Sequence, residues 1–91
     1  MARRLSHSKD APKNLFGPTL KALRLRAGLT QADLARKLQL DRWDVDEVVI
    51  SYIENSRRMI TDIELCLFLS ALGAKLSDLE GTFQKRKGTV S

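Results

Sequence analysis

Residues 30–58, TQADLARKLQLDRWDVDEVVISYIENSRR, decide the fold of this chain. The stretch opens with Thr30, a residue type that caps helices, and apolar side chains follow at spacings of three and four, as in a helix that buries one face. This pattern stops at residues 39–43 and begins again after Asp44. The sequence therefore predicts two short helices joined by a connection.

The second of these helices is expected to run from about residue 45 to residue 55. Asp44 stands three residues before Glu47, a spacing typical of a capping box, in which each residue accepts a hydrogen bond from the backbone N–H of the other. Carboxylates are favoured there because the N-terminus of a helix carries a partial positive charge. The residues expected to be buried are Val45, Val49, Ile50 and Ile53.

Three further helices are predicted, over residues 18–27, over residues 61–72 and in a short segment from residue 77. No segment shows the alternation of apolar and polar residues that a strand requires. The sequence therefore predicts an all-α bundle of five helices. The start signals are Pro18 and the capping-box pairs Thr61 with Glu64 and Ser77 with Glu80, and the stop signals are Gly28 and Gly73.

The 91 residues suffice for one small domain with short tails. We expect a flexible basic arm over residues 1–16, a folded domain over residues 17–83 and a basic tail over residues 84–91. No apolar run is long enough to cross a membrane, and the N-terminus lacks the apolar stretch of a signal peptide. The protein is therefore expected to be cytoplasmic and soluble.

Composition argues against catalysis. The chain has one cysteine, Cys66, and one histidine, His7, which excludes an internal disulfide and an ordinary zinc cluster. It has no nucleophile paired with a base and no glycine-rich phosphate loop, so we predict no enzymatic activity, no metal and no cofactor. Cys66 is interpreted as a small core residue.

The formal net charge of +5 matches the electrostatic character of nucleic-acid-binding proteins, which gain affinity by neutralising phosphates and releasing counterions. The charge is unevenly distributed. Basic residues concentrate in residues 1–26 and 84–91, whereas residues 41–54 are acidic. This acidic middle bears on any function assigned to the second helix of the quoted stretch.

Three separated stretches resemble one family in order and spacing. They are GPTLKALRLRAGLTQADLA at 17–35, ISYIENSRR at 50–58, and TDIEL with ALG between Thr61 and Gly73. Together they resemble the phage-repressor domains of the Cro-like, XRE family, over residues 17–81. One departure is a longer connection between Leu40 and Ile50, similar to a variant of the family that carries a Trp-Asp pair, here Trp43 and Asp44. We expect Trp43 to pack against this longer turn.

The resemblance implies a helix-turn-helix that binds double-stranded DNA, the first helix of the pair crossing the phosphate backbone and the second entering the major groove. It implies a sequence-specific transcriptional regulator, a repressor acting as a homodimer. Gln31 is expected to bind a phosphate or to buttress the second helix. The implied base-facing residues are Asp46, Glu47, Val48, Ser51 and Tyr52, and the implied phosphate contacts are Thr30, Gln31, Asn55, Arg57 and Arg58.

The acids at the base-facing positions depart from the family pattern. A carboxylate can accept from the cytosine amino group, and Val48 can cover a thymine methyl group; for comparison, one good bidentate base contact gains roughly 1–3 kcal/mol. A carboxylate near phosphates is repelled by about 1 kcal/mol. An alternative therefore stays open: a protein-interaction module, an antitoxin-like or adaptor subunit, that binds a basic partner through the acidic turn at residues 41–47.

The helix over residues 61–72 is apolar on nearly every side, and such a helix is normally buried all round. A bundle of this size cannot enclose it alone, so the sequence predicts a homodimer. The basic arm around Arg3 and Arg4 is expected to add contacts to DNA. The predicted dimer-interface residues are Leu67, Leu76, Leu79 and Phe83.

Overall fold

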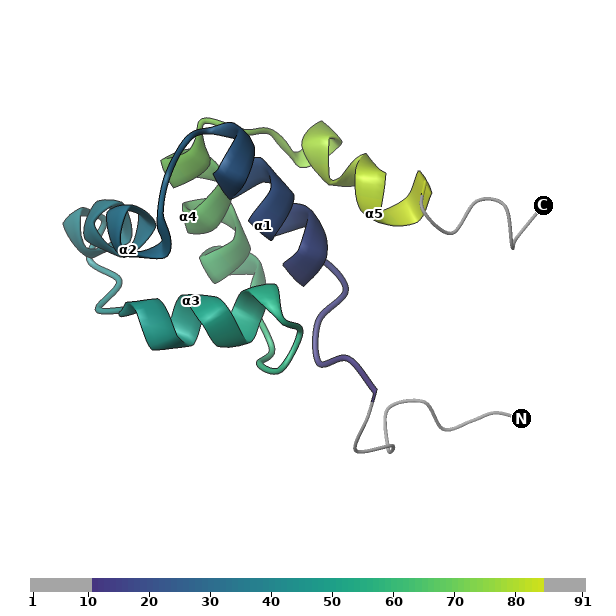
Figure 1. Ribbon diagram of the computed structural model, residues 1–91, viewed down its shortest axis with the longest axis horizontal. Coiled ribbons are helices and arrows are strands. Elements are labelled where there is room, and N and C mark those ends of the chain that lie inside the picture. The colour runs from purple at the N-terminus through teal and green to yellow at the C-terminus, as the bar shows by residue number, and fades with distance from the viewer. Residues whose placement is uncertain (1–10, 85–91) are drawn as a thin grey trace.

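A computed structural model describes residues 11–84 of the chain, and within that range it is all-α. Five α-helices and one short 3₁₀ helix, η2, follow in order, and Figure 1 shows α3 on the opposite side of the molecule from the connection between α4 and α5. The bounds are α1 Gly17–Arg26, α2 Gln31–Leu40, α3 Glu47–Glu54, α4 Asp62–Leu72, η2 Leu76–Leu79 and α5 Glu80–Gln84. The predicted class and number of helices are confirmed.

The core lies where the first four helices meet. Each of α1 to α4 supplies a side chain that is completely buried, and the same apolar spacings that predict the helices from sequence direct these side chains inward. Trp43, in the connection before α3, packs at 6.4 Å between ring centroids against Phe68 of α4, as expected for a residue that fills a longer turn. The completely buried core residues are Leu20, Leu34, Leu38, Ile50, Ile53 and Phe68.

Two helix starts follow the predicted capping chemistry. The Thr30 hydroxyl accepts from the backbone N–H of Asp33 at 3.0 Å, and the Asp33 carboxylate accepts from the N–H of Thr30 at 3.0 Å. Thr61 and Glu64 make the same reciprocal pair, at 3.1 Å in both directions. These bonds satisfy backbone donors that would otherwise lack partners, so they fix where α2 and α4 begin.

The predicted cap of α3 at Asp44 is wrong. Asp46 is the N-cap, its Oδ1 accepting from the backbone N–H of Val49 at 3.1 Å, and the helix begins at Glu47. The connection turns at Arg42, whose φ of 72° lies in the left-handed region, and then delivers Val45 into the core at 2% exposure. Burial of Val45 ahead of the helix therefore moves the N-cap of α3 by two residues, from the predicted Asp44 to Asp46.

The predicted start of the last helix at Ser77 is also wrong. The backbone N–H of Lys75 donates to Asp78 Oδ2 at 2.9 Å, and a 3₁₀ turn precedes α5, which begins at Glu80. The tighter turn brings Leu79 into the core, where it is 3% exposed. Packing of this leucine thus outweighs the capping pattern read from the sequence.

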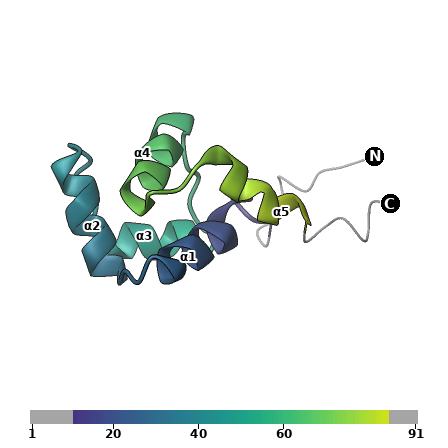
Figure 2. The ribbon, with the colours of Figure 1, turned by 90° about the horizontal axis from the view of Figure 1, so that it is seen from above.

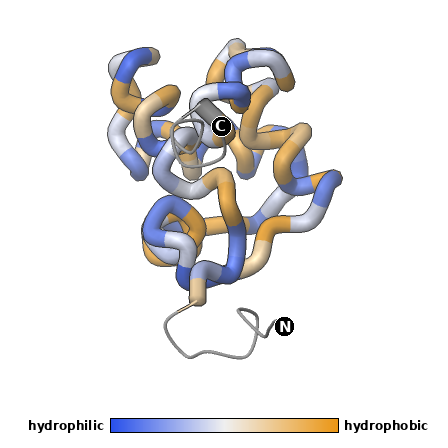
Figure 3. Tube along the Cα trace, turned by 90° about the vertical axis from the view of Figure 1, so that its right-hand side faces the viewer, coloured by the Kyte–Doolittle hydropathy of each residue, from blue (hydrophilic) through white to orange (hydrophobic). Residues whose placement is uncertain are grey.

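The outer side of α4 is exposed within the single chain. Ile63 is 70% exposed and Cys66 is also exposed, whereas Phe68 and Leu69 face the core. The prediction that Cys66 is a core residue is therefore wrong. In the hydropathy view of Figure 3, hydrophobic segments extend to the outside of the described trace as well as to its interior. No helix among the described residues is long and apolar enough to cross a membrane.

The segment before α1 is held against the turn that follows α3, seen beside α1 in Figure 2. Asn14 Nδ2 donates to the carbonyl oxygens of Ile53 at 3.0 Å and Arg58 at 2.8 Å, while its Oδ1 accepts from the Gly17 N–H at 2.6 Å. The N–H of Lys13 donates to the Ser56 carbonyl at 2.8 Å. The predicted boundary of a free arm at residue 16 is therefore wrong for residues 13–16.

The remaining arm and tail predictions lie largely outside the described residues. Residues 1–10, with Arg3 and Arg4, and residues 85–91 are not described. Gln84, placed in the tail by the sequence, is the last residue of α5.

Replacing Gly17 by Ala should lower the free energy of unfolding by about 1–3 kcal/mol, because the new methyl group would overpack the contact between α1 and α3. A Cβ at this position would lie 2.8 Å from the Glu54 carbonyl oxygen and 2.9 Å from Ser56 Oγ, and would also clash with the Ile53 carbonyl. Urea denaturation measures the change.

Gly81→Ala in α5 is the matched control, since no atom lies within 4 Å of a Cβ built there. Removing a helical glycine should stabilise the fold by about 0.5–1 kcal/mol or leave it unchanged. Equal effects of the two substitutions would contradict the close approach described for Gly17.

Candidate nucleic-acid interface

The exposed face of α3 carries four of the five residues predicted to face bases. Val48 and Tyr52 are 56% and 51% exposed, Glu47 is exposed and Ser51 is half-buried. They stand at positions i, i+1, i+4 and i+5, which share one side of a helix, and Ile50 and Ile53 occupy the other side at 0% exposure. α3 is therefore an amphipathic helix whose apolar side packs into the core and whose outer side is exposed.

Asp46, the fifth predicted residue, has a structural role at the head of α3. Its Oδ1 accepts the N–H of Val49, so the carboxylate satisfies a backbone donor of the first turn. Only Glu47 of the two acids belongs to the helix proper. The two acids therefore differ in role: Asp46 caps α3, whereas Glu47 stands on its exposed face.

The two residues at the start of α2 that were predicted to contact phosphates have different structural roles: Thr30 caps α2, and Gln31 supports α3. Thr30 is exposed, but its hydroxyl is engaged in the capping box. Gln31 Nε2 donates to Glu54 Oε1 at 3.1 Å, which ties the first turn of α2 to the last residue of α3. Of the two roles predicted for Gln31, the structure shows the contact that buttresses the second helix.

A buried ion pair at this junction was not predicted. Arg24 Nε donates to Glu54 Oε2 at 2.6 Å and its Nη2 to Oε1 at 3.0 Å, with side-chain exposures of 7% and 1%. Arg24 Nη1 also donates to the Leu29 carbonyl at 2.8 Å. The signal in the sequence is that Arg24 follows Leu20 by four residues and Glu54 follows Ile50 by four, so both charges fall on the buried faces of their helices.

The turn after α3 carries two arginines, of which only Arg58 has a side-chain partner among residues 11–84. Arg57 is exposed. Arg58 donates from Nη1 and Nη2 to the two carboxylate oxygens of Glu64, at 3.0 and 3.3 Å. The hydrogen bond from Arg58 is the largest influence lowering the pKa of Glu64, burial opposes it, and the backbone N–H of Thr61 lowers the pKa further. Asn55 turns back on Ser51, donating to its carbonyl oxygen at 2.9 Å.

The four residues predicted at a dimer interface differ in how exposed they are. Leu76 is 67% exposed and Phe83 is 56% exposed, its ring packing edge-on against Phe16 at a centroid separation of 6.1 Å. Leu67 is half-buried. Leu79 is 3% exposed and belongs to the core of the single chain, so for Leu79 the prediction is wrong.

Two helices joined by a turn, the second held against the core with a free outer face, define a helix-turn-helix DNA-binding domain. The chain belongs to this family, because the family description "Helix-turn-helix domain" matches residues 15–80. The expected resemblance to Cro-like, XRE-family domains is confirmed.

Among solved structures, the chain is similar to a single-site mutant of the restriction-modification controller protein C.Esp1396I. The match has a TM-score of 0.63 and 26% sequence identity, and it covers 100% of both chains. No curated protein sequence matches the chain. The fold thus resembles that of a controller protein, in a match that covers the whole of both chains.

Glu54→Gln should lower the free energy of unfolding by about 3–5 kcal/mol, because it leaves the Arg24 guanidinium buried without a countercharge. Chemical denaturation measures the loss. Replacing both partners by apolar residues, Arg24→Met with Glu54→Leu, should recover most of it, since no charge then remains buried.

The matched control is Arg36→Ala, which breaks the exposed pair between Arg36 and Asp33. Arg36 is 69% exposed in its side chain, so the expected cost is at most about 1 kcal/mol. A loss for Glu54→Gln no larger than that of Arg36→Ala would contradict a structural role for the buried pair.

Proposed function

We propose that this chain is a sequence-specific transcriptional regulator that binds double-stranded DNA as a homodimer and represses transcription by occupying promoter DNA. The observation that carries the proposal is the outer face of α3, which no other described element covers and which ends beside the exposed Arg57. In helix-turn-helix proteins this face enters the major groove, while the start of the first helix of the pair approaches a phosphate.

Phosphate contacts supply most of the affinity in this proposal. Arg57 is exposed in the turn after α3, and its planar guanidinium can bind two phosphate oxygens at once. Arg58 is held by Glu64, so it contributes less unless that pair opens on DNA. Thr30, at the start of α2, and Asn55, at the end of α3, add exposed polar residues near the junction of these two helices. The basic residues outside the described range add general attraction to DNA.

A narrower proposal concerns the kind of regulator. A solved structure that matches the whole of this chain is a restriction-modification controller protein, at 26% identity. We infer that this chain has a similar regulatory role.

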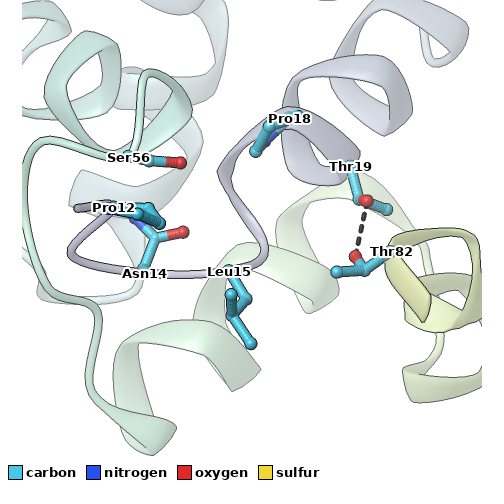
Figure 4. A pocket seen from close by; sticks show the side chains of 7 residues that line it. All are labelled: Pro12, Asn14, Leu15, Pro18, Thr19, Ser56 and Thr82. Carbon is cyan, nitrogen blue, oxygen red and sulfur yellow. Dashed lines mark hydrogen bonds between the residues drawn. The ribbon is translucent and has the colours of Figure 1, made fainter. Parts of the chain in front are cut away.

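The proposed dimer uses apolar side chains around α5. Leu76 and Phe83 are exposed, and a shallow, mostly apolar pocket of about 240 Å³ lies between α5 and the segment before α1. Figure 4 shows Leu15 and Pro12 on one side of this pocket and Thr82, hydrogen-bonded to Thr19 at 2.6 Å, on the other. Exposed apolar surface of this kind is found at protein interfaces.

Arg57→Ala should weaken binding to all DNA sequences alike and lower the slope of log affinity against log salt concentration by about one, because one phosphate contact is lost. Fluorescence anisotropy over a series of salt concentrations measures both quantities. Lys75→Ala is the matched control: Lys75 is exposed in the connection between α4 and η2, on the opposite side of the molecule from α3.

Equal slopes for the two variants would contradict the placement of Arg57 on the DNA. Absence of any DNA binding at low salt would instead favour the protein-interaction alternative. That alternative draws support from the exposed carboxylates of Asp41, Asp44 and Glu47 in and after the connection.

Leu76→Glu should shift the chain from dimer to monomer, because it places a charge on the proposed apolar interface. Sedimentation equilibrium measures the shift, and affinity for a DNA site with two half-sites about 34–36 Å apart should fall with it. Leu40→Glu is the control, since Leu40 is 84% exposed at the end of α2 far from α5. A wild-type chain that is monomeric at micromolar concentration would overturn the dimer.

A further inference from the structure

We propose that Glu47 and Val48 specify the DNA half-site, Glu47 by selecting a cytosine and Val48 by contacting the methyl group of a neighbouring thymine. The inference rests on the proposed function, because it assigns the sequence that the α3 face recognises. It follows from the position, exposure and bonding of these two side chains.

The start of α3 at Glu47 separates the roles of the two adjacent acids. Asp46 Oδ1 is held by the Val49 N–H at 3.1 Å, which fixes its carboxylate against the helix end. Glu47 is the first residue of the helix, is exposed, and makes no side-chain hydrogen bond or ion pair with any other described residue. Glu47 is therefore the acid that is free to reach a base.

The chemistry of a carboxylate restricts which base Glu47 can accept. An ionised carboxylate has acceptors only, so it needs a donor on the base edge. In the major groove guanine presents N7 and O6 acceptors, and thymine presents the O4 acceptor and a methyl group. In an A·T pair the adenine N6 donor lies between two acceptors, N7 and the thymine O4, which repel a carboxylate, whereas in a G·C pair the cytosine N4 donor has an acceptor, guanine O6, on one side only. Cytosine is thus the preferred partner.

Val48 supplies the apolar half of the recognition. It lies in the first turn of α3, next to Glu47, and its apolar side chain is 56% exposed. Tyr52 follows four residues later on the same side and continues an apolar row along the helix. The only apolar group on a major-groove base edge is the C5-methyl group of thymine.

The negative charge of Glu47 lowers the affinity for DNA of any sequence, and this makes a role in base selection testable. Phosphates flank the groove, so a carboxylate there is repelled by every DNA sequence. Neutralising it should strengthen or preserve binding to random DNA while removing discrimination against the wrong base. A residue that merely holds the helix in place would lose both properties together.

The experiment selects bound sites from a random DNA pool at low salt with the wild-type chain and with Glu47→Gln. The wild-type chain should enrich a cytosine at one position of each half-site, and replacing it by guanine should weaken binding by about tenfold or more. Glu47→Gln should enrich adenine at that position, because an amide pairs with the N6 and N7 of adenine. Its affinity for random DNA should not fall.

Asp44→Asn is the matched control, since Asp44 is an exposed acid of the connection that lies outside α3. It should leave the selected sequence unchanged. For Val48, uracil in place of the neighbouring thymine removes only the methyl group. The wild-type chain should bind the uracil site several-fold more weakly, while Val48→Ala should bind the two sites nearly equally.

The outcomes separate this inference from the proposed function. If the wild-type chain and Glu47→Gln select the same DNA sequence, Glu47 does not specify a base, but sequence-specific binding is still supported. No enrichment by the wild-type chain at low salt would overturn the proposed function and this inference together. Equal binding of thymine and uracil sites by the wild-type chain would overturn the role of Val48.

Discussion

The buried ion pair between Arg24 and Glu54 is the interaction on which the arrangement of the helices depends. It links α1 to the last residue of α3, and Gln31 joins the first turn of α2 to the same carboxylate. Arg24 also holds the Leu29 carbonyl in the turn between α1 and α2. Charges removed from water are stable only when their hydrogen bonds are satisfied, so this network admits one relative position of the three helices.

Side chains that are not part of α3 fix both of its ends. Asp46 caps the N-terminus, and Asn14 binds the Ile53 and Arg58 carbonyl oxygens at the other end. Gly17 allows the two backbones to approach each other there, because any Cβ would clash. The segment before α1 is thus a brace for the turn that carries Arg57, and not only a connection to the basic N-terminus.

Local signals in the sequence predict most of the fold. Most of the predictions that were wrong concern which residues are buried. Thr30 and Thr61 mark helix starts that depend only on neighbouring residues. The apolar period fixes which face of α3 is buried, so the exposed face on which four of the residues predicted to face bases stand could be read from the sequence. The Arg24–Glu54 pair was missed because its partners come from separate helices whose packing no local pattern encodes. The cap at Asp46 was missed because two aspartates have suitable spacing and only tertiary burial chooses between them.

Under the proposed function, the firm placement of α3 and the negative charge of Glu47 are linked, because electrostatic attraction and repulsion depend differently on distance. A carboxylate gains from a base donor only at hydrogen-bond distance, whereas its repulsion by phosphates changes slowly with position. A small displacement of α3 would therefore remove the gain and keep the cost. A chain that presents Glu47 to DNA needs its recognition helix held more firmly than one that presents an arginine, which is attracted wherever it lies. The buried pair, the cap at Asp46 and the brace from Asn14 provide that constraint.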